Sequence, residues 1–171
     1  MGLLRIGGCY LTVLGMMLFT FGCSFNHSKH SSDTQSKNAM LTRLNPSQLP
    51  PSAGQSHVVI SNAKQTAYLS GQIAVDSDGK LVGVGSFRGQ LQQVLANIDN
   101  ALAAANTSRT NVIRLTIYVV NLDVATHGPI LRELLGDMSS FSHPAATLVS
   151  VAGLAMPELM IEIDVIAAVE E

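Results

Sequence analysis

The spacing of apolar residues between positions 87 and 121 constrains the fold of this chain more than any other feature. Apolar side chains first recur at intervals of three and four, which places them on one face of a helix. These residues are Phe87, Leu91, Val94, Leu95, Ile98, Leu102 and Ala105. Over residues 112–121 the interval shortens to two, so Ile113, Leu115, Ile117 and Val119 share one face of a strand. A helix over 87–106 and a strand over 112–121 predict a domain that mixes helices and sheet.

Shorter segments on either side extend this pattern. We expect further strands at 57–61, 66–75, 80–85, 146–152 and 159–169, and a second helix at 127–138 with Pro129 in its first turn. A turn between the first two strands should allow them to pair with each other, and a second turn should lead the chain back into the third strand. The predicted fold class is α+β, with order βββαβαββ and a sheet of about six strands covered on one face by two helices. The other face is also apolar and requires a partner.

Composition and charge exclude several classes of function. Hydrophobic residues make up 47% of the chain and charged residues only 13%, so there is enough apolar material for an ordered core. The formal net charge is -2, and nucleic acid is therefore not expected as a partner. His57, His127 and His143 are far apart, and no metal or nucleophile motif accompanies them. These residues therefore indicate neither a metal site nor a catalytic triad.

One glycine-rich motif needs its own interpretation. Gly83-x-Gly85-x-x-x-Gly89 lies between a predicted strand and a predicted helix, where phosphate-binding loops occur. The preceding strand belongs to a hairpin rather than to a parallel βαβ unit, and the last spacing is one residue too long. We interpret the motif as structural rather than as a nucleotide site.

The N-terminal segment differs in character from the rest. Residues 6–22 form one apolar stretch after a single cation, which is typical of a secretion signal. Cys23, which follows a glycine, resembles the acylated cysteine of the bacterial lipoprotein lipobox. We expect residues 1–23 to be the signal, with Cys23 as the lipid anchor of an exported, membrane-attached protein. We expect 24–41 to be a flexible polar tether and 42–171 to be the folded domain.

Other interpretations of this segment stay open. An uncleaved signal anchor is one, because 17 apolar residues lie at the lower limit of the ~17–25 needed to cross a bilayer. Secretion after cleavage at a small residue is another, and translation from Met40 would give a cytosolic protein. Cys9 and Cys23 are the only cysteines, so no disulfide is expected in the folded domain.

Two carboxylates on the last predicted strand are candidates for chemistry. The alternation over 159–169 places Glu162 and Asp164 on one largely apolar face. Burying both is costly unless a cation or hydrogen-bond donors serve them. In one interpretation Arg114 pairs with a carboxylate across the sheet; in the other, Glu162 lines a cavity and handles a proton.

Five segments in order resemble the RidA/YjgF/Rid family over about residues 44–169. They are Ser70-Gly71-Gln72, Gln90-x-x-x-Val94-x-x-Asn97, the strand 112–118, His143-Pro144-Ala145 and the closing Ile161-Glu162-Ile163-Asp164-Val165-Ile166-Ala167. The resemblance implies a chorismate-mutase-like fold that forms homotrimers with ligand clefts between subunits. Family enzymes hydrolyse enamines and imines to 2-keto acids and ammonia, using water and a carboxylate without a cofactor.

The family's site residues match this chain only in part. The resemblance implies that Glu162 is the catalytic acid, which positions or deprotonates water, and that Gly71, Ala146 and Leu148 contact the ligand. In active members an arginine that binds the substrate carboxylate follows Pro-Ala, whereas Ala146 stands there in this chain.

Further departures affect the same cleft. Gln55 replaces a tyrosine, no asparagine lies near Gly128-Pro129, and the loop 154–157 is one residue longer than in the deaminases. Since the bidentate arginine–carboxylate pair is missing, we expect deaminase activity to be weak or lost. The expected ligand is a small, uncharged or weakly polar carbonyl- or imine-like molecule.

Two alternatives remain. One is an active imine deaminase in which Arg114 or Arg132 supplies the missing cation. The other is a non-enzymatic, chaperone-like trimer that contacts other proteins.

Overall fold

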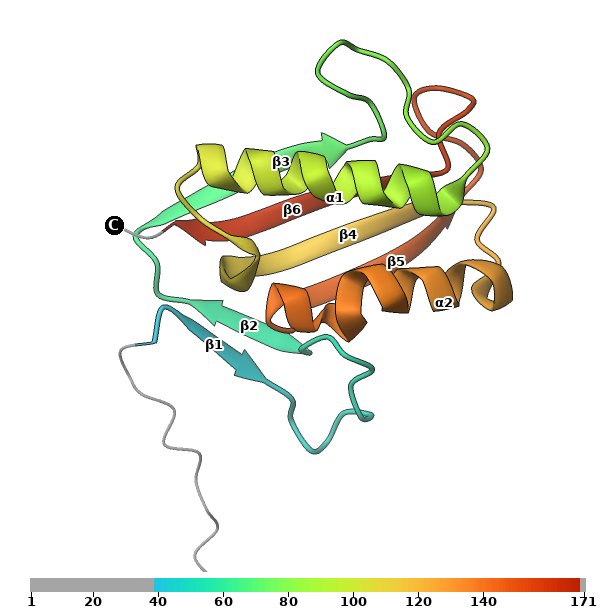
Figure 1. Cartoon of the computed structure of the whole chain (residues 1–171). Coiled ribbons are helices and arrows are strands. Elements are labelled where there is room, and N and C mark those ends of the chain that lie inside the picture. The colour runs from blue at the N-terminus through green and yellow to red at the C-terminus, as the bar shows by residue number, and fades with distance from the viewer. Residues whose placement is uncertain (1–38, 170–171) are drawn as a thin grey trace, which may run out of the picture. The chain divides into compact units, whose positions relative to one another are not determined.

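A computed structural model describes residues 39–169 (Figure 1). The strands are β1 (Leu41–Leu44), β2 (Val58–Ser61), β3 (Gln65–Gln72), β4 (Val112–Val120), β5 (Ala145–Val151) and β6 (Ile161–Val169). The helices are α1 (Phe87–Ala104) and α2 (Val124–Leu135), with short 3-10 helices at Arg109–Asn111 and Gly136–Phe141. The predicted α+β class is confirmed, and the order βββαβαββ also matches, although β1 takes the place of the strand predicted at 80–85.

The six strands form two sheets rather than one. β1 and β2 make an antiparallel pair, and the other four strands have the order β3-β6-β4-β5, in which only β4 and β5 run parallel. Both helices lie against the same face of the four-stranded sheet, as predicted (Figure 1). Neither helix covers the opposite face, where the side chain of Tyr68 on β3 is 78% exposed.

The strand pairing at the start of the domain differs from the prediction. β2 pairs with β1 rather than with β3, and β3 pairs with the last strand, β6, from Gln65 opposite Val169 onward. β1 itself begins at Leu41, inside the segment predicted to be tether. Strand partners are decided by contacts between residues far apart in the sequence, which local turn chemistry does not reveal.

The strand predicted at 80–85 is absent. Only an isolated bridge between Val75 and Leu81 forms there. Gly83 and Gly85 have φ angles of 73° and 70°, which turn the chain in a direction that an extended strand cannot follow.

Helix α1 supplies much of the core. It begins at Phe87 because the Ser86 hydroxyl accepts a hydrogen bond from the Gly89 N–H at 3.1 Å, which caps the helix. Its buried residues follow the predicted face, and they are Phe87, Gln90, Leu91, Val94, Leu95, Ile98 and Leu102. The core cluster they join includes buried side chains of β4 and β6, among them Leu115, Ile117, Val119, Ile161, Ile163 and Val165.

Two amides of α1 hold neighbouring loops. Gln90 is fully buried, and its Nε2 donates to the Glu158 carbonyl at 2.8 Å while its Oε1 accepts from the Met160 N–H at 2.8 Å. Asn97 Nδ2 donates to two carbonyl oxygens just after β3, both at 2.9 Å. Because an unpaired buried polar group is costly, these bonds fix the segments that enter β6 and leave β3.

The glycine motif packs a turn against α1. A Cβ on Gly83 would lie 2.6 Å from the backbone nitrogen of Gln90 and 2.7 Å from the carbonyl carbon of Gly89. A Cβ on Gly89 would in turn lie 3.2 Å from the Gly83 Cα. The two glycines therefore allow close backbone contact, which gives the motif a structural role.

Helix α2 begins three residues earlier than predicted. The Asp123 carboxylate accepts a hydrogen bond from the Ala125 N–H at 3.0 Å, so the helix starts at Val124. Pro129 is therefore the sixth helical residue and does not lie in the first turn. Gly136, with φ of 58°, ends the helix in the left-handed conformation.

Within residues 39–169 no helix has both the length and the apolar character needed to cross a bilayer. The predicted signal, the predicted lipid anchor Cys23 and nearly all of the predicted tether lie outside the described residues.

Candidate ligand-binding site

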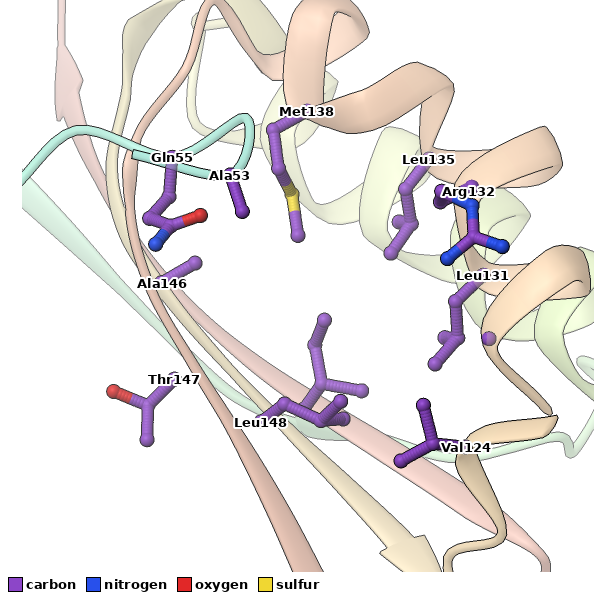
Figure 2. A pocket seen from close by; sticks show the side chains of 12 residues that line it. Ala53, Gln55, Val124, Leu131, Arg132, Leu135, Met138, Ala146, Thr147 and Leu148 are labelled. Atoms are coloured by element: carbon purple, nitrogen blue, oxygen red, sulfur yellow. The ribbon is translucent and has the colours of Figure 1, made fainter. Parts of the chain in front are cut away.

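A cavity of about 270 Å³ lies between α2 and β5 (Figure 2). Its wall is mostly apolar, and it consists of Ala53, Gln55, Ile117, Val124, Gly128, Leu131, Arg132, Leu135, Met138, Ala146, Thr147 and Leu148. Ala146 and Leu148, two of the residues predicted to contact a ligand, thus belong to one pocket.

The strand register explains why these two residues face α2. β5 pairs with β4 in parallel, with Ala146 opposite Leu115 and Leu148 opposite Ile117. Leu115 and Ile117 are buried beneath the helices, so their partners on β5 point the same way. β5 is the edge strand of its sheet, and Leu148 is 45% exposed, so the pocket opens to solvent there.

A hydrogen-bonded loop forms another part of the wall. His143 Nδ1 lies 2.6 Å from the Gly54 carbonyl oxygen, and the Ser56 hydroxyl donates to the His143 carbonyl at 2.6 Å. Since a carbonyl only accepts, His143 Nδ1 carries the proton in this bond. These bonds place Gln55 in the same wall as Ala146 (Figure 2).

Glu162 lies on the other face of the sheet. The predicted alternation is confirmed, because Ile161 and Ile163 are fully buried while Glu162 and Asp164 are half-buried. A Cβ on Gly71 would lie 1.7 Å from Glu162 Oε1. The Glu162 side chain therefore occupies space that any side chain at Gly71 would fill, and the two predicted site residues are in contact.

Asp164 has a different partner from the one considered in the sequence. Its Oδ2 accepts a hydrogen bond from the Tyr118 hydroxyl at 3.0 Å. This bond and the charge of Asp164 raise the pKa of Tyr118 above its ordinary value. Within residues 39–169 no ion pair joins Arg114 to Glu162 or Asp164, because Arg114 lies opposite Ile166, further along the strand.

The predicted site residues form two groups on opposite faces of the four-stranded sheet. Ala146 and Leu148 line the pocket under α2, whereas Gly71 and Glu162 lie on the face that neither helix covers. The sheet separates the groups, so one chain does not present both to one ligand. A ligand that touches all four residues requires two copies of the chain.

Arg132 brings a positive charge to the pocket. Among the lining residues that the structure describes it is the one with a charged side chain, and it comes from α2 rather than from β5 (Figure 2). Of the two arginines considered as replacement cations, Arg132 lines this pocket and Arg114 does not. The expectation of an uncharged ligand rested on the loss of the arginine at Ala146, yet the pocket still contains a guanidinium.

The remaining pocket residues were not recognisable from the sequence. Leu131 and Leu135 are buried residues of α2, but the same spacing serves a packed core and a pocket wall equally. Val124 and Met138 lie at the two ends of the helical segment, and no pattern in the sequence distinguishes them from ordinary packing residues.

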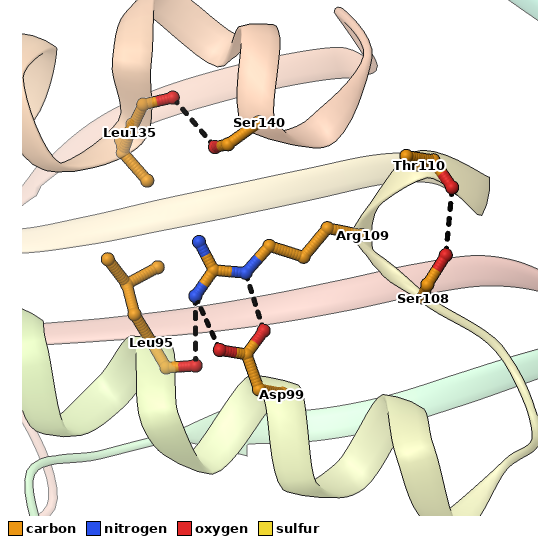
Figure 3. A network of polar contacts seen from close by, with 7 residues as sticks. All are labelled: Leu95, Asp99, Ser108, Arg109, Thr110, Leu135 and Ser140. Atoms are coloured by element: carbon orange, nitrogen blue, oxygen red, sulfur yellow. Dashed lines mark hydrogen bonds and ion pairs between the residues drawn. The ribbon is translucent and has the colours of Figure 1, made fainter.

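A polar network beside the pocket fixes the end of α2 (Figure 3). Arg109 binds both carboxylate oxygens of Asp99, through Nε at 2.5 Å and Nη2 at 2.7 Å, and its guanidinium carbon lies 5.0 Å from the centre of the Phe141 ring. The Ser140 hydroxyl donates to the Leu135 carbonyl at 3.0 Å. These contacts tie the 3-10 helix that follows α2 to α1 and so hold this side of the pocket.

The histidines of the domain have structural contacts. His57 Nε2 lies 2.8 Å from the Pro50 carbonyl oxygen, and buried His127 Nδ1 accepts a hydrogen bond from the Asp123 N–H at 3.0 Å. Across residues 39–169, no three His, Cys, Asp or Glu side chains gather in a way that could hold a metal ion.

The fold and the site together define a class of small α+β domains. In this class an apolar pocket lies between a helix and one face of a sheet, and a carboxylate lies on the opposite face, which neither helix covers. The chain belongs to the RidA/YjgF/Rid family, because the family profile described as Endoribonuclease L-PSP matches residues 46–169.

Individual relatives agree with this assignment. HMF1 from Saccharomyces cerevisiae is 32% identical over 131 residues, which cover 75% of this chain and 98% of HMF1. The Rid-family protein YyfB from Yersinia pestis, described as of unknown function, has a structure with 34% identity and a TM-score of 0.71, covering 77% of this chain and 100% of YyfB. RidA from the Antarctic bacterium Psychrobacter sp. is 26% identical with a TM-score of 0.54, covering 75% of this chain and 99% of that RidA.

Proposed function

We propose that this protein binds a small carbonyl- or imine-like molecule in a cleft built by two copies of the chain, and that its hydrolysis of 2-imino acids is weak or lost. The pocket between α2 and β5 of one copy would hold the ligand, and Glu162 of a second copy would act on water. The observation that carries the proposal is Ala146 in the pocket wall, at the position where active family members have the arginine that binds the substrate carboxylate.

The chemistry of this site would be hydrolytic. The water oxygen would bond to the carbon of the C=N bond while Glu162 accepts one proton from that water and passes it to the nitrogen, which gives a carbinolamine. The hydroxyl proton of the carbinolamine would then move to the nitrogen as the C–N bond breaks, so that ammonia leaves and the C=O bond forms. The product is the matching carbonyl compound. No electrons are exchanged, so the reaction needs no redox partner.

A homotrimer would bring the two groups of site residues together. The face that neither helix covers carries the exposed side chain of Tyr68, which lies opposite Ile166, as well as Glu162 and Gly71, and large exposed apolar side chains favour association. Multi-angle light scattering of the full chain in a non-ionic detergent should give a protein mass of three chains. A monomeric mass would remove the basis for a shared cleft.

The test of the function restores the missing cation. We expect Ala146→Arg to raise the rate of 2-iminobutanoate hydrolysis at least about tenfold, as measured by the release of 2-oxobutanoate from freshly generated imine. Adding Glu162→Gln to this variant should abolish the gain. If the unaltered chain already hydrolyses the imine rapidly and Glu162→Gln stops it, the proposed loss of activity is wrong.

A mixing experiment tests whether two copies share the cleft. Leu148→Trp should block the pocket, and Glu162→Gln should remove the acid. Both changes are made separately in the Ala146→Arg chain, where activity is measurable. Co-assembly of the two inactive chains should restore activity, because some clefts then combine an open pocket with an intact Glu162. No restoration, despite mixed trimers, would place the site within one chain.

Active imine deamination is the second candidate, and one observation favours it. Arg132 lines the same pocket as Ala146, so a guanidinium is available to a substrate carboxylate. Under this candidate the unaltered chain hydrolyses 2-iminobutanoate and Ala146→Arg gives no further gain.

Export and anchoring through Cys23 are a separate proposal, supported by the apolar stretch at 6–22. Mass spectrometry of the N-terminal peptide from native cells should detect an acylated Cys23. An N-terminus at Met40 would instead favour a cytosolic protein.

A further inference from the structure

Another cavity, of about 470 Å³, lies between α1 and the loop that follows β3. Most of its lining side chains are polar, and they are Gln72, Asp76, Ser77, Gln93, Asn97 and Asn100. Among the lining residues that the structure describes, Asp76 is the one with a charge. We propose that this cavity binds a small organic cation through a primary ammonium group. The inference involves neither the pocket under α2 nor Glu162, so it does not depend on the proposed function.

The cavity lies on the helix side of the four-stranded sheet. Gln72 pairs with Ile163 on β6, and Ile163 is fully buried in the core that α1 covers, so the two side chains point the same way. Gly71, by contrast, faces Glu162 on the side that neither helix covers. Association of chains through that uncovered face would leave this cavity accessible.

The domain itself fixes the orientation of three carboxamides in the cavity. Asn97 Nδ2 donates to two carbonyl oxygens just after β3, so Asn97 Oδ1 points the other way and accepts from Gln93 Nε2 at 2.9 Å. Gln72 Nε2 donates to the Ser70 carbonyl at 2.9 Å. Because a carbonyl oxygen only accepts, none of these amides can turn over without losing its bonds. Their nitrogens donate within the domain, and the side-chain oxygens of Gln72 and Gln93 remain as acceptors for a ligand.

Asp76 adds an acceptor that is charged. Its Oδ1 accepts from the N–H groups of Asp78 at 3.0 Å and Lys80 at 2.9 Å, and this turn holds the half-buried carboxylate at the cavity. Its Oδ2 accepts no bond within residues 39–169, and the exposed Lys80 side chain forms no ion pair with it. Internal bonding therefore leaves three oxygens from three side chains, one of them anionic.

This arrangement suits an ammonium group better than other cations. An ammonium is a compact charge with three N–H donors, which matches three separate oxygens. A guanidinium prefers both oxygens of one carboxylate, and Oδ1 of Asp76 is already occupied. Within residues 39–169 no three His, Cys, Asp or Glu side chains are grouped to hold a metal ion. The cavity is also larger than a single ion requires, and Val75 in its wall offers apolar contact to an alkyl chain.

The experiment compares three probes that differ in the head group. Butylammonium has a charge and N–H donors, butyltrimethylammonium has the charge alone, and 1-butanol has no charge. Binding to the full chain in a non-ionic detergent is followed by the side-chain amide resonances of Gln72, Gln93 and Asn100. Butylammonium should shift these resonances in a saturable manner and bind at least about tenfold more tightly than either other probe.

Asp76→Asn is the decisive variant. An asparagine side chain can still accept the two N–H groups of the turn, whereas an amide nitrogen replaces the available Oδ2, so butylammonium binding should weaken at least about tenfold. The matched control is Asp78→Asn, which removes the same charge from an exposed side chain of the same loop, outside the lining, and should leave the affinity unchanged. Gln93→Met removes another of the three oxygens without altering the loop, and it should also weaken binding.

Several results would overturn the proposal. If butylammonium causes no saturable shift, or if butyltrimethylammonium binds equally well, the oxygens of the cavity do not select an ammonium group. If Asp78→Asn weakens binding as much as Asp76→Asn does, the probe responds only to the charge of the loop. If Asp76→Asn and Gln93→Met both bind butylammonium as tightly as the unaltered chain, the cavity is not the binding site. None of these results bears on the proposed imine chemistry, which uses other residues.

Discussion

Replacing Gly83 by alanine should destabilise the domain far more than replacing Gly85, although the two glycines are two residues apart in one turn. Their φ angles are nearly equal, 73° and 70°, so an added Cβ meets the same backbone strain at both positions. The two sites differ only in what surrounds that Cβ. At Gly83 it would lie 2.6 Å from the backbone nitrogen of Gln90, and at Gly85 nothing lies within 4 Å.

The magnitudes follow from these two contributions. A non-glycine residue in the left-handed region costs about 1–2 kcal/mol, which applies to both variants. The contact at Gly83 is with backbone atoms in the first turn of α1, which cannot rotate away, and forced overpacking of this kind costs roughly 1–3 kcal/mol more. The smaller entropy of the unfolded chain favours both alanine variants equally and cancels in the comparison. We expect a loss of about 3 kcal/mol for Gly83→Ala and about 1 kcal/mol for Gly85→Ala.

Urea denaturation followed by far-ultraviolet circular dichroism gives both free energies of unfolding. The variants should share one denaturant slope and differ in midpoint, because the change acts on the folded state. Equal losses for the two variants would refute the assignment of Gly83 to a packing role. The glycine motif would then need another explanation, such as the phosphate-binding role that its position before a helix first suggested.

Three further predictions concern the site and its supports. Gly71→Ala should cost less than about 1 kcal/mol, because the atom 1.7 Å from its Cβ is the movable end of the Glu162 side chain, yet it should remove any hydrolysis that depends on Glu162. A loss of stability as large as that of Gly83→Ala would contradict this reasoning. Gln90→Leu should cost about 2–4 kcal/mol, because two buried backbone groups lose their partners, whereas the exposed control Gln92→Leu should be nearly neutral in the same denaturation assay. Tyr118→Phe should be less stable than the unaltered chain at pH 7, and the difference should narrow as the pH rises above about 10, because the pKa of Tyr118 is raised in the folded state and its bond is lost when the phenol ionises. A gap that stays constant up to pH 11 would mean that the bond to the Asp164 carboxylate adds no stability.

The elements with strong periodicity could be predicted from the sequence. The apolar face of α1 and the alternation of β4 and β6 match the structure, because burial of one face imposes a regular spacing on the residues that form it. For the same reason the alternation correctly placed Glu162 and Asp164 together on one face of β6. The family profile confirms the resemblance to Rid proteins over residues 46–169. That resemblance had implied that Glu162 and Gly71 both belong to the ligand site.

Only the tertiary structure decided which strands pair and what surrounds each candidate residue. The strand β3 pairs with β6 from the far end of the chain, and Asp164 binds Tyr118 instead of Arg114, since partners across a sheet depend on register rather than on residue type. The same is true of the pocket, where Arg132 on α2 and Ala146 on β5 line one cavity although they lie fourteen positions apart in different elements. A sequence specifies the periodicity that each element needs in order to bury one face. The closeness of particular side chains arises only when those faces pack together.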